Sequence, residues 1–271
     1  MNVAHTAHTH GGSPAVLPLL LVAVAAAGYL ALASMRRRDG RGWRTWRTVG
    51  FVVGCAALAL GLTPQVLPYP SGDFREHMLQ HLLIGMIAPL GLVLAAPMTL
   101  VLRSIPAEAG RRVGRLLRSR PLHVLVHPVT ALVLNIGGMA VLYLTPLYVA
   151  VTASPAVHHV VHLHFLAAGC LFTWAIAGPD PAPRRPSVPA RLVVLGVAIA
   201  FHAVLSQLMY AGLVVDVPVP DDQRRGGAEL MYYGGDLAEL LLAFALVTTW
   251  RRRRSVPARS PRSAALGDVG R

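Results

Sequence analysis

Long apolar stretches alternate with short polar segments along almost the whole chain. Such stretches cover residues 14–35, 49–67, 77–102, 125–148, 156–177, 192–215 and 231–250. An α-helix needs about 20 mainly apolar residues to cross ~30 Å of hydrocarbon. The pattern therefore predicts an all-α membrane protein, in which seven transmembrane helices form a bundle over residues 14–250. Because no basic residue precedes Arg36, the first stretch is interpreted as a retained span and not as a secretory signal.

Composition agrees with a membrane protein. Of the 271 residues, 54% are hydrophobic and only 14% are charged, which is atypical of a soluble domain. All 25 basic residues are arginines, and without lysine the chain has no Schiff-base site for retinal. Cys55 and Cys170 lie in different predicted spans and are interpreted as small apolar residues.

The arginines predict the orientation. Of the 25, 22 fall between spans 1 and 2, between spans 3 and 4, between spans 5 and 6, or after span 7. Because cytoplasmic loops collect arginine, these segments are predicted inside, with the N-terminus outside and the C-terminus cytoplasmic. A charge distributed in this way does not indicate a nucleic-acid partner. The predicted location is the plasma membrane, crossed several times.

Two polar tails flank the predicted bundle. Residues 1–13 form an outer tail with His5, His8 and His10, which either collects metal or is simply solvated. Residues 251–271 contain seven arginines but few apolar side chains. This second tail is predicted to be a basic, disordered cytoplasmic segment.

Two pairs of histidines, each four residues apart, open predicted spans. His77 and His81 begin span 3, and His158 and His162 begin span 5. Both spans run from outside to inside, so the pairs share the outer face, with His81 about 6 Å deeper than His77. Neutral imidazoles at such an entrance suit a late transition metal. The four histidines are therefore the predicted metal ligands, provided that spans 3 and 5 are neighbours.

Other side chains near this level are candidate additional ligands or supporting groups. Helical rotation leaves either His158 or His159 as the partner of His162, whereas His164 points away. Met78 and Met231 offer thioethers, which would favour Cu(I). In span 7, Asp236 and Glu239 share one face. An acid inside a span needs a partner, so these two are expected to orient histidines, bind the metal or pair with an outer arginine.

Other histidines have simpler explanations. A single histidine at a membrane interface is usually an amphipathic anchor, and His123 and His127, among arginines at the cytoplasmic end of span 4, are interpreted in that way. The residues His202, Ser206 and Met209 form one face of span 6, which favours a hydrogen-bonded bundle core over an inner metal relay. Asp221, Asp222 and Gln223 are expected in a polar loop before span 7.

Several short motifs, taken in order, resemble those of one family. They are His77-Met-Leu-Gln-His81 with Pro89 and Pro97, Leu142-Tyr-Leu-Thr-Pro-Leu-Tyr148, His162-Leu-His-Phe165 with Gly169, Gly178-Pro-Asp-Pro181, and Asp222-Gln223 with Gly226-Gly227. The set resembles the seven-helix CtaG-type assembly proteins of caa3 cytochrome c oxidase. A tryptophan expected early in span 7 is replaced by Met231, Tyr232 and Tyr233.

The resemblance implies a non-enzymatic assembly factor for a haem–copper cytochrome c oxidase. It implies that copper, as Cu(I), is held near the outer face at His77, His81, His158 and His162 and passed to an oxidase subunit. Asp222 and Gln223 correspond to the family's loop motif. The copper centre of the oxidase lies in the outer half of the membrane, the level predicted for these histidines.

Two alternatives use the same residues. A membrane cytochrome or quinone-linked redox protein would use the histidine pairs as haem ligands. A copper or proton transporter would use His202, Ser206 and Met209 as a station in the middle of the membrane. The oligomeric state is left open by the sequence.

Overall fold

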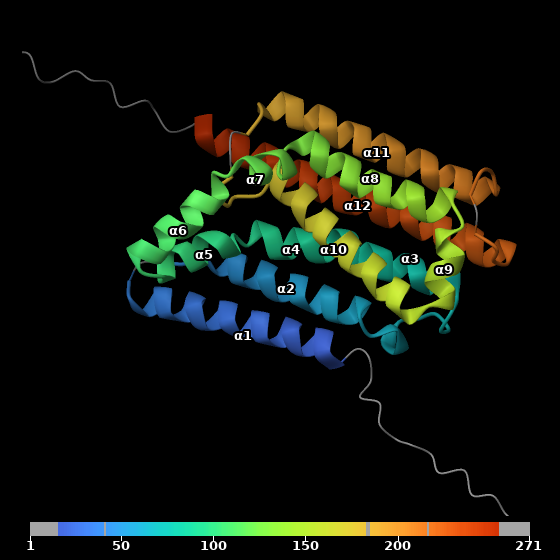
Figure 1. The fold of residues 1–271 in the computed structure, drawn as a ribbon, viewed down its shortest axis with the longest axis horizontal. Helices are drawn as coiled ribbons and strands as arrows, with labels where there is room; N and C mark the ends of the chain where they lie inside the picture. Colours follow the sequence, from blue (N-terminus) through green and yellow to red (C-terminus); the bar gives the residue numbers. More distant parts are fainter. Residues whose placement is uncertain (1–15, 41, 183–184, 216, 255–271) are drawn as a thin grey trace, which may run out of the picture.

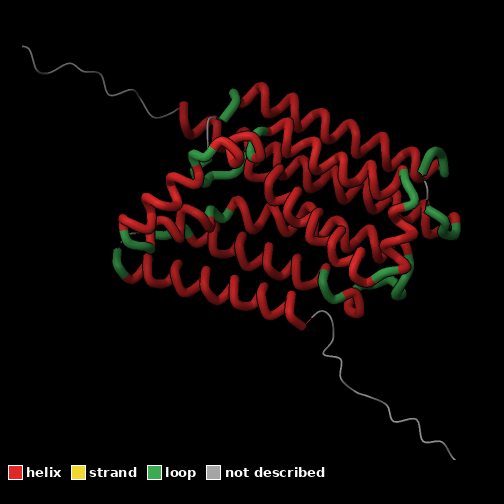
Figure 2. The backbone as a smooth tube through the Cα atoms, viewed as in Figure 1, coloured by secondary structure: helices red, strands yellow, loops and turns green. Residues whose placement is uncertain are grey.

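The computed structural model describes residues 16–40, 42–182, 185–215 and 217–254, and these residues form a helical bundle (Figure 1). Throughout the described ranges the elements are helices joined by loops and turns, without strands (Figure 2). The outer tail with His5, His8 and His10, Asp216, and most of the C-terminal tail lie outside the described residues.

The helices follow one another along the chain as follows: α1 (Val16–Arg38), α2 (Thr45–Gly61), the 3₁₀ turn η1 (Pro64–Val66), α3 (Phe74–Leu82), the π-helical turn η2 (Leu83–Ile87), α4 (Ala88–Leu94), α5 (Pro97–Ser104), α6 (Ala107–Leu117), α7 (Arg120–Leu125), α8 (Pro128–Leu144), α9 (Leu147–Ala153), α10 (Pro155–Ile176), α11 (Val188–Ala211) and α12 (Asp221–Arg254). Helix α10 runs diagonally between α2 and α4 on one side and α8, α11 and α12 on the other (Figure 1). The first turns of α3, α10 and α12 gather with α9 at one end, here called the histidine end, and α5, α6 and α7 lie at the other end.

Several of these helices are long and apolar enough to cross a membrane. Five qualify within the described residues: α1, the continuous run Phe74–Ser104, α10, α11 and α12 as far as Thr248. Helices α8 and α9 meet at a bend of 80° and make a sixth if they form one broken span. Helix α2, with 17 residues, is shorter. The chain is thus a multi-pass membrane protein, while the count of seven and the orientation stay predictions.

Span 3 is not a uniform α-helix. Pro89 has no backbone N–H, and its ring excludes the carbonyl four residues earlier, that of Gly85, from normal helical geometry. The structure absorbs this in the π turn Leu83–Ile87, directly before α4. A second irregularity follows at Ala96, whose left-handed backbone (φ 59°) separates α4 from α5. Span 3 therefore consists of a first part that carries His77 and His81 and a second part that begins at Pro89.

Span 7 begins ten residues before its predicted start. Asp222 and Gln223, expected in a loop, lie in the first turn of α12. The expectation was wrong because hydropathy detects only the apolar part of a helix. Acidic side chains in a first turn interact favourably with the helix dipole, so Asp221 and Asp222 can begin a helix whose apolar part starts near Met231.

Arginines complete two helix ends. Nη1 of Arg191 donates to the carbonyl of Ile176 in the last turn of α10, and Nη1 of Arg224 donates to the carbonyls of Met209 and Tyr210 at the end of α11. The last carbonyls of a helix have no partner within the helix. The two guanidinium groups supply donors for them and fix how α10 meets α11 and how α11 meets α12.

Candidate metal site

Spans 3 and 5 are neighbours, as the metal prediction requires. Gly169 of α10 faces the π turn so closely that a Cβ atom there would overlap the carbonyl oxygen of Gly85 and lie 2.9 Å from Cγ of Pro89. Small residues allow this kind of approach between membrane helices. The contact brings α10 against the part of the chain that follows His81.

His77 is tied to an aromatic and sulfur cluster at the histidine end. Its Nε2 lies 3.3 Å from the hydroxyl oxygen of Tyr143 in α8, and the same hydroxyl donates to Sδ of Met78 at 3.6 Å. The imidazole also meets the ring of Tyr148 edge to face, with centroids 5.3 Å apart. Because one hydroxyl bridges an imidazole and a thioether, Tyr143 fixes the positions of both candidate ligands.

His81 is almost completely buried, with 4% of its surface exposed. Its ring meets that of Phe165 edge to face at 4.5 Å between centroids. Neither Nδ1 nor Nε2 has a hydrogen-bond partner among the described residues. Since buried polar atoms are normally paired, this imidazole has the features of a ligand for something that the protein itself does not supply.

The second pair lies on α10 and contains one similar imidazole. The rings of His158 and His162 are 4.1 Å apart between centroids, so His158 and not His159 is next to His162. His162 is 7% exposed, and its buried Nε2 lacks a hydrogen-bond partner. Both His158 and His162 are near enough to His77 to interact with it electrostatically. His164 instead faces α8, with Nε2 3.2 Å from the carbonyl oxygen of Leu134, as helical rotation predicts.

The two acids of span 7, Asp236 and Glu239, lie in different surroundings. Oε1 of Glu239 lies 3.6 Å from Nδ1 of His202 in α11, and these residues are 6% and 2% exposed. Gly235 makes the pairing possible, because a Cβ atom there would overlap the ring of His202. Glu239 therefore supports the interior histidine of span 6, whereas Asp236 is half-buried. His202, Ser206 and Met209 share a buried face, as predicted.

Polar residues at the start of α12 and directly before α3 organise the beginning of α3. Oε1 of Gln223 accepts a hydrogen bond from the backbone N–H of Phe74 at 3.2 Å, while Asp222 is exposed. Asp73 caps α3 by accepting from the backbone N–H of Arg75 at 2.8 Å. The guanidinium of Arg75 also donates to this carboxylate and lowers the pKa of Asp73 below its usual value. Gln223 thus holds the first turn of the helix that carries His77.

A small cavity lies beside His81. It has a volume of about 10 Å³ and is lined by His81, Met86 of the π turn, Asn135 and Met139 of α8, and Glu239. Asn135, Met86, Met139 and Tyr143 were not among the residues selected from the sequence. Tyr143 belongs to a motif that carried the family resemblance, but Met86 follows His81 by five residues, a spacing that an uninterrupted α-helix would place on another face.

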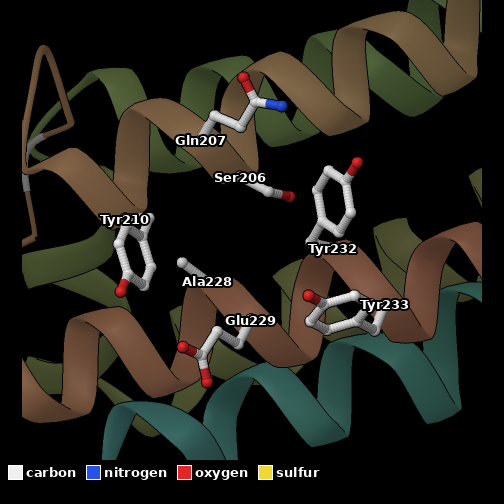
Figure 3. A pocket seen from close by; sticks show the side chains of 7 residues that line it. All are labelled: Ser206, Gln207, Tyr210, Ala228, Glu229, Tyr232 and Tyr233. Carbon is white, nitrogen blue, oxygen red and sulfur yellow. The ribbon is translucent and has the colours of Figure 1, made fainter.

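In the described ranges, no group of three or more histidine, cysteine, aspartate or glutamate side chains is positioned to hold a metal ion. A larger hollow lies elsewhere, between α11 and α12. It measures about 370 Å³ and is lined by Ser206, Gln207, Tyr210, Ala228, Glu229, Tyr232 and Tyr233 (Figure 3). Its exposed tyrosines are typical of a membrane–water interface.

Comparisons with known proteins agree with the resemblance. The sequence model of the family described as cytochrome c oxidase caa3 assembly factor (Caa3_CtaG) matches residues 27–253. Uncharacterized proteins of Mycobacterium bovis and Mycobacterium tuberculosis are each 36% identical over 262 residues, covering 89% of this chain and 40% of theirs. One of Mycobacterium leprae is 32% identical, covering 83% and 37%. The chain spans about 40% of the length of these curated relatives. No solved structure matches it significantly.

Proposed function

This chain belongs to the cytochrome c oxidase caa3 assembly factor family, and from that premise we propose that it holds Cu(I) as cargo at the histidine end and passes it to an oxidase subunit. The proposed ligands are His77, His81, His158 and His162; the described residues do not gather them into a ready-made group, so the ion would have to draw them together. Met78 and the residues of the first turn of α12 support them from nearby.

The observation that carries the proposal is the pair of imidazoles with unpartnered buried nitrogens. Both ring nitrogens of His81 and Nε2 of His162 lack hydrogen-bond partners in the part of the chain that the structure describes, and the two histidines lie on neighbouring spans near the same end of the bundle. Leaving a buried polar group unpaired costs about 1–3 kcal/mol. A bound metal ion would satisfy these nitrogens, so the cost that they carry in its absence favours uptake of the ion.

The arrangement also suits transfer in preference to catalysis. A handful of imidazole and thioether ligands binds Cu(I) without the permanence of a closed thiolate cage. The histidine end is predicted to face outside, the side on which an oxidase subunit would receive copper. We assign no catalytic step to any of these residues.

The test is complementation of a strain that lacks the gene and grows with limiting copper. We expect the double variant His77→Ala/His158→Ala to show the low oxidase activity of the deletion strain, with activity restored by added copper. His123→Ala is the control, because this histidine is exposed and lies near the opposite end of the bundle. Full oxidase activity of the double variant at limiting copper contradicts the proposal.

The alternatives give different results in the same strains. A Soret band in the purified wild-type protein would favour a haem protein. Copper uptake by vesicles that depends on His202 would favour a transporter.

A further inference from the structure

Two methionines line the small cavity beside His81, together with Asn135 and Glu239. Met86 of the π turn and Met139 of α8 line the same space as His81, so residues with thioether side chains come to it from two helices. Met139 is 5% exposed, and both ring nitrogens of His81 are buried without a hydrogen-bond partner. The volume of about 10 Å³ is close to that of one water-sized sphere. The cavity thus fits one small ion or molecule.

We propose that this cavity is a second, deeper Cu(I) site, in which the thioethers of Met86 and Met139 and the imidazole of His81 bind the ion. The inference rests on the proposed function and adds a route for the cargo. His81 is shared between the histidine end and the deeper site, so Cu(I) passes from one to the other by exchanging ligands on a common imidazole.

The donor set selects the ion. Thioethers are soft ligands that favour Cu(I), whereas Zn²⁺ and Mg²⁺ prefer nitrogen, thiolate or oxygen donors. A charge inside a membrane span is costly unless it has a partner. The carboxyl group of Glu239 also lines the cavity, and its Oε2 is buried without a hydrogen-bond partner. A carboxylate there balances the single positive charge of Cu(I).

The π turn is the structural reason that Met86 takes part. Along an α-helix, five residues rotate by about 500°, which would place Met86 about 140° away from His81. A π turn pairs residue i with residue i+5 and is frequent at functional sites. The turn at Leu83–Ile87 therefore brings an imidazole and a thioether from one span to the same cavity.

The experiment uses the purified full chain, loaded anaerobically with Cu(I) against a chromophoric Cu(I) chelator. The test variant is Met86→Leu/Met139→Leu, and Met209→Leu is the control, because its thioether is fully buried but does not line this cavity. Leucine replaces methionine at similar volume and usually costs less than about 1.5 kcal/mol. Size-exclusion profiles and unfolding temperatures verify that the variants fold.

We expect the wild type and Met209→Leu to show sulfur neighbours in the copper X-ray absorption spectrum. In Met86→Leu/Met139→Leu the sulfur signal should fall, and one Cu(I) should bind at least about tenfold more weakly, which corresponds to ~1.4 kcal/mol. Equal sulfur signal and equal affinity in all three proteins overturn the inference.

The two proposals fail in distinguishable ways. Copper held by nitrogen ligands alone, with equal affinity in the three proteins, overturns the deeper site and leaves the histidine end intact. Copper that depends on Met86 and Met139, together with full oxidase activity of His77→Ala/His158→Ala at limiting copper, supports the deeper site and overturns the role of the histidine end. A wild-type protein that binds no Cu(I) overturns both.

Discussion

The approach of α10 to the π turn gives the sharpest prediction, for the variant Gly169→Ala. The added methyl group would overlap the carbonyl oxygen of Gly85 and lie 2.9 Å from Cγ of Pro89, against about 3.4 Å for ordinary contact. Neither obstacle is the flexible end of a side chain. Because backbone and a proline ring cannot rotate away, the two spans must move apart.

The cost follows from two opposing terms. Overpacking a close contact destabilises by about 1–3 kcal/mol, and replacing glycine by alanine within a helix stabilises by up to ~1 kcal/mol. Gly196 of α11 provides the matched control, since it is exposed within a helix and a Cβ atom there would contact nothing within 4 Å. The two variants should therefore differ by roughly 2 kcal/mol, which is about 4–8 °C in unfolding temperature on the scale of soluble domains.

Thermal unfolding of the purified variants in the same detergent measures this difference, and Cu(I) affinity is measured in parallel. We expect Gly169→Ala to unfold below the wild type and to bind Cu(I) more weakly, because the imidazoles on the two spans separate. Gly196→Ala should match or exceed the wild type in both measurements. If Gly169→Ala unfolds at the temperature of Gly196→Ala, α10 does not pack on the π turn as described.

Three further predictions concern single side chains. Tyr143→Phe removes the hydroxyl between Nε2 of His77 and Sδ of Met78. This variant should bind Cu(I) more weakly by about 1 kcal/mol, or ~5-fold, in a competition with a chelator. Unchanged affinity would mean that the hydroxyl does not position these ligands. Asp180→Ala removes the acceptor for the backbone N–H groups of Met98 and Thr99 and for the Thr99 hydroxyl, and should lower the free energy of unfolding by about 1–3 kcal/mol, with Asp180→Asn losing less. Arg75 lowers the pKa of Asp73, so ionised Asp73 stabilises the fold above its unfolded pKa of ~3.9, and this contribution is lost as the pH falls through the lower folded value. The unfolding temperatures of the wild type and Asp73→Asn, which keeps a helix-capping side chain, should accordingly differ at pH 7 and converge below about pH 4.

Hydropathy predicted the helices of the bundle well, and the reason is physical. In a membrane, backbone polar groups must be satisfied within the segment, so a long apolar run forms a helix. The predicted span 156–177 agrees with α10 to within one residue at each end. Polar helix ends leave no such signal, and for this reason the early start of α12 at Asp221 was missed.

Helical periodicity also predicted part of the candidate site. It placed His164 away from His162 and put His202 on a buried face, and both are observed. It could not predict contacts between spans, such as Glu239 with His202 or Tyr143 with His77, because the relative rotation of two helices depends on their packing. The role of Asp180 was also not predictable from the sequence. The motif around it suggested a family, but only the fold shows that its carboxylate caps α5.

The π turn at Leu83–Ile87 sets the rotation of α3 about the helix axis relative to α4. Before the turn, α3 directs His77 and His81 toward Tyr143 and Phe165. After the turn, the rotation of α4 is set by its packing on α2. Deleting one residue within the turn would remove its extra residue and change the rotation between the two parts of the span, with almost no change in hydropathy. Each residue contributes about 100° of rotation, so the histidines would turn away from their neighbours while the span still crossed the membrane. Among relatives of this chain, the length of this single turn should therefore be more tightly constrained than the identity of the apolar residues that form it.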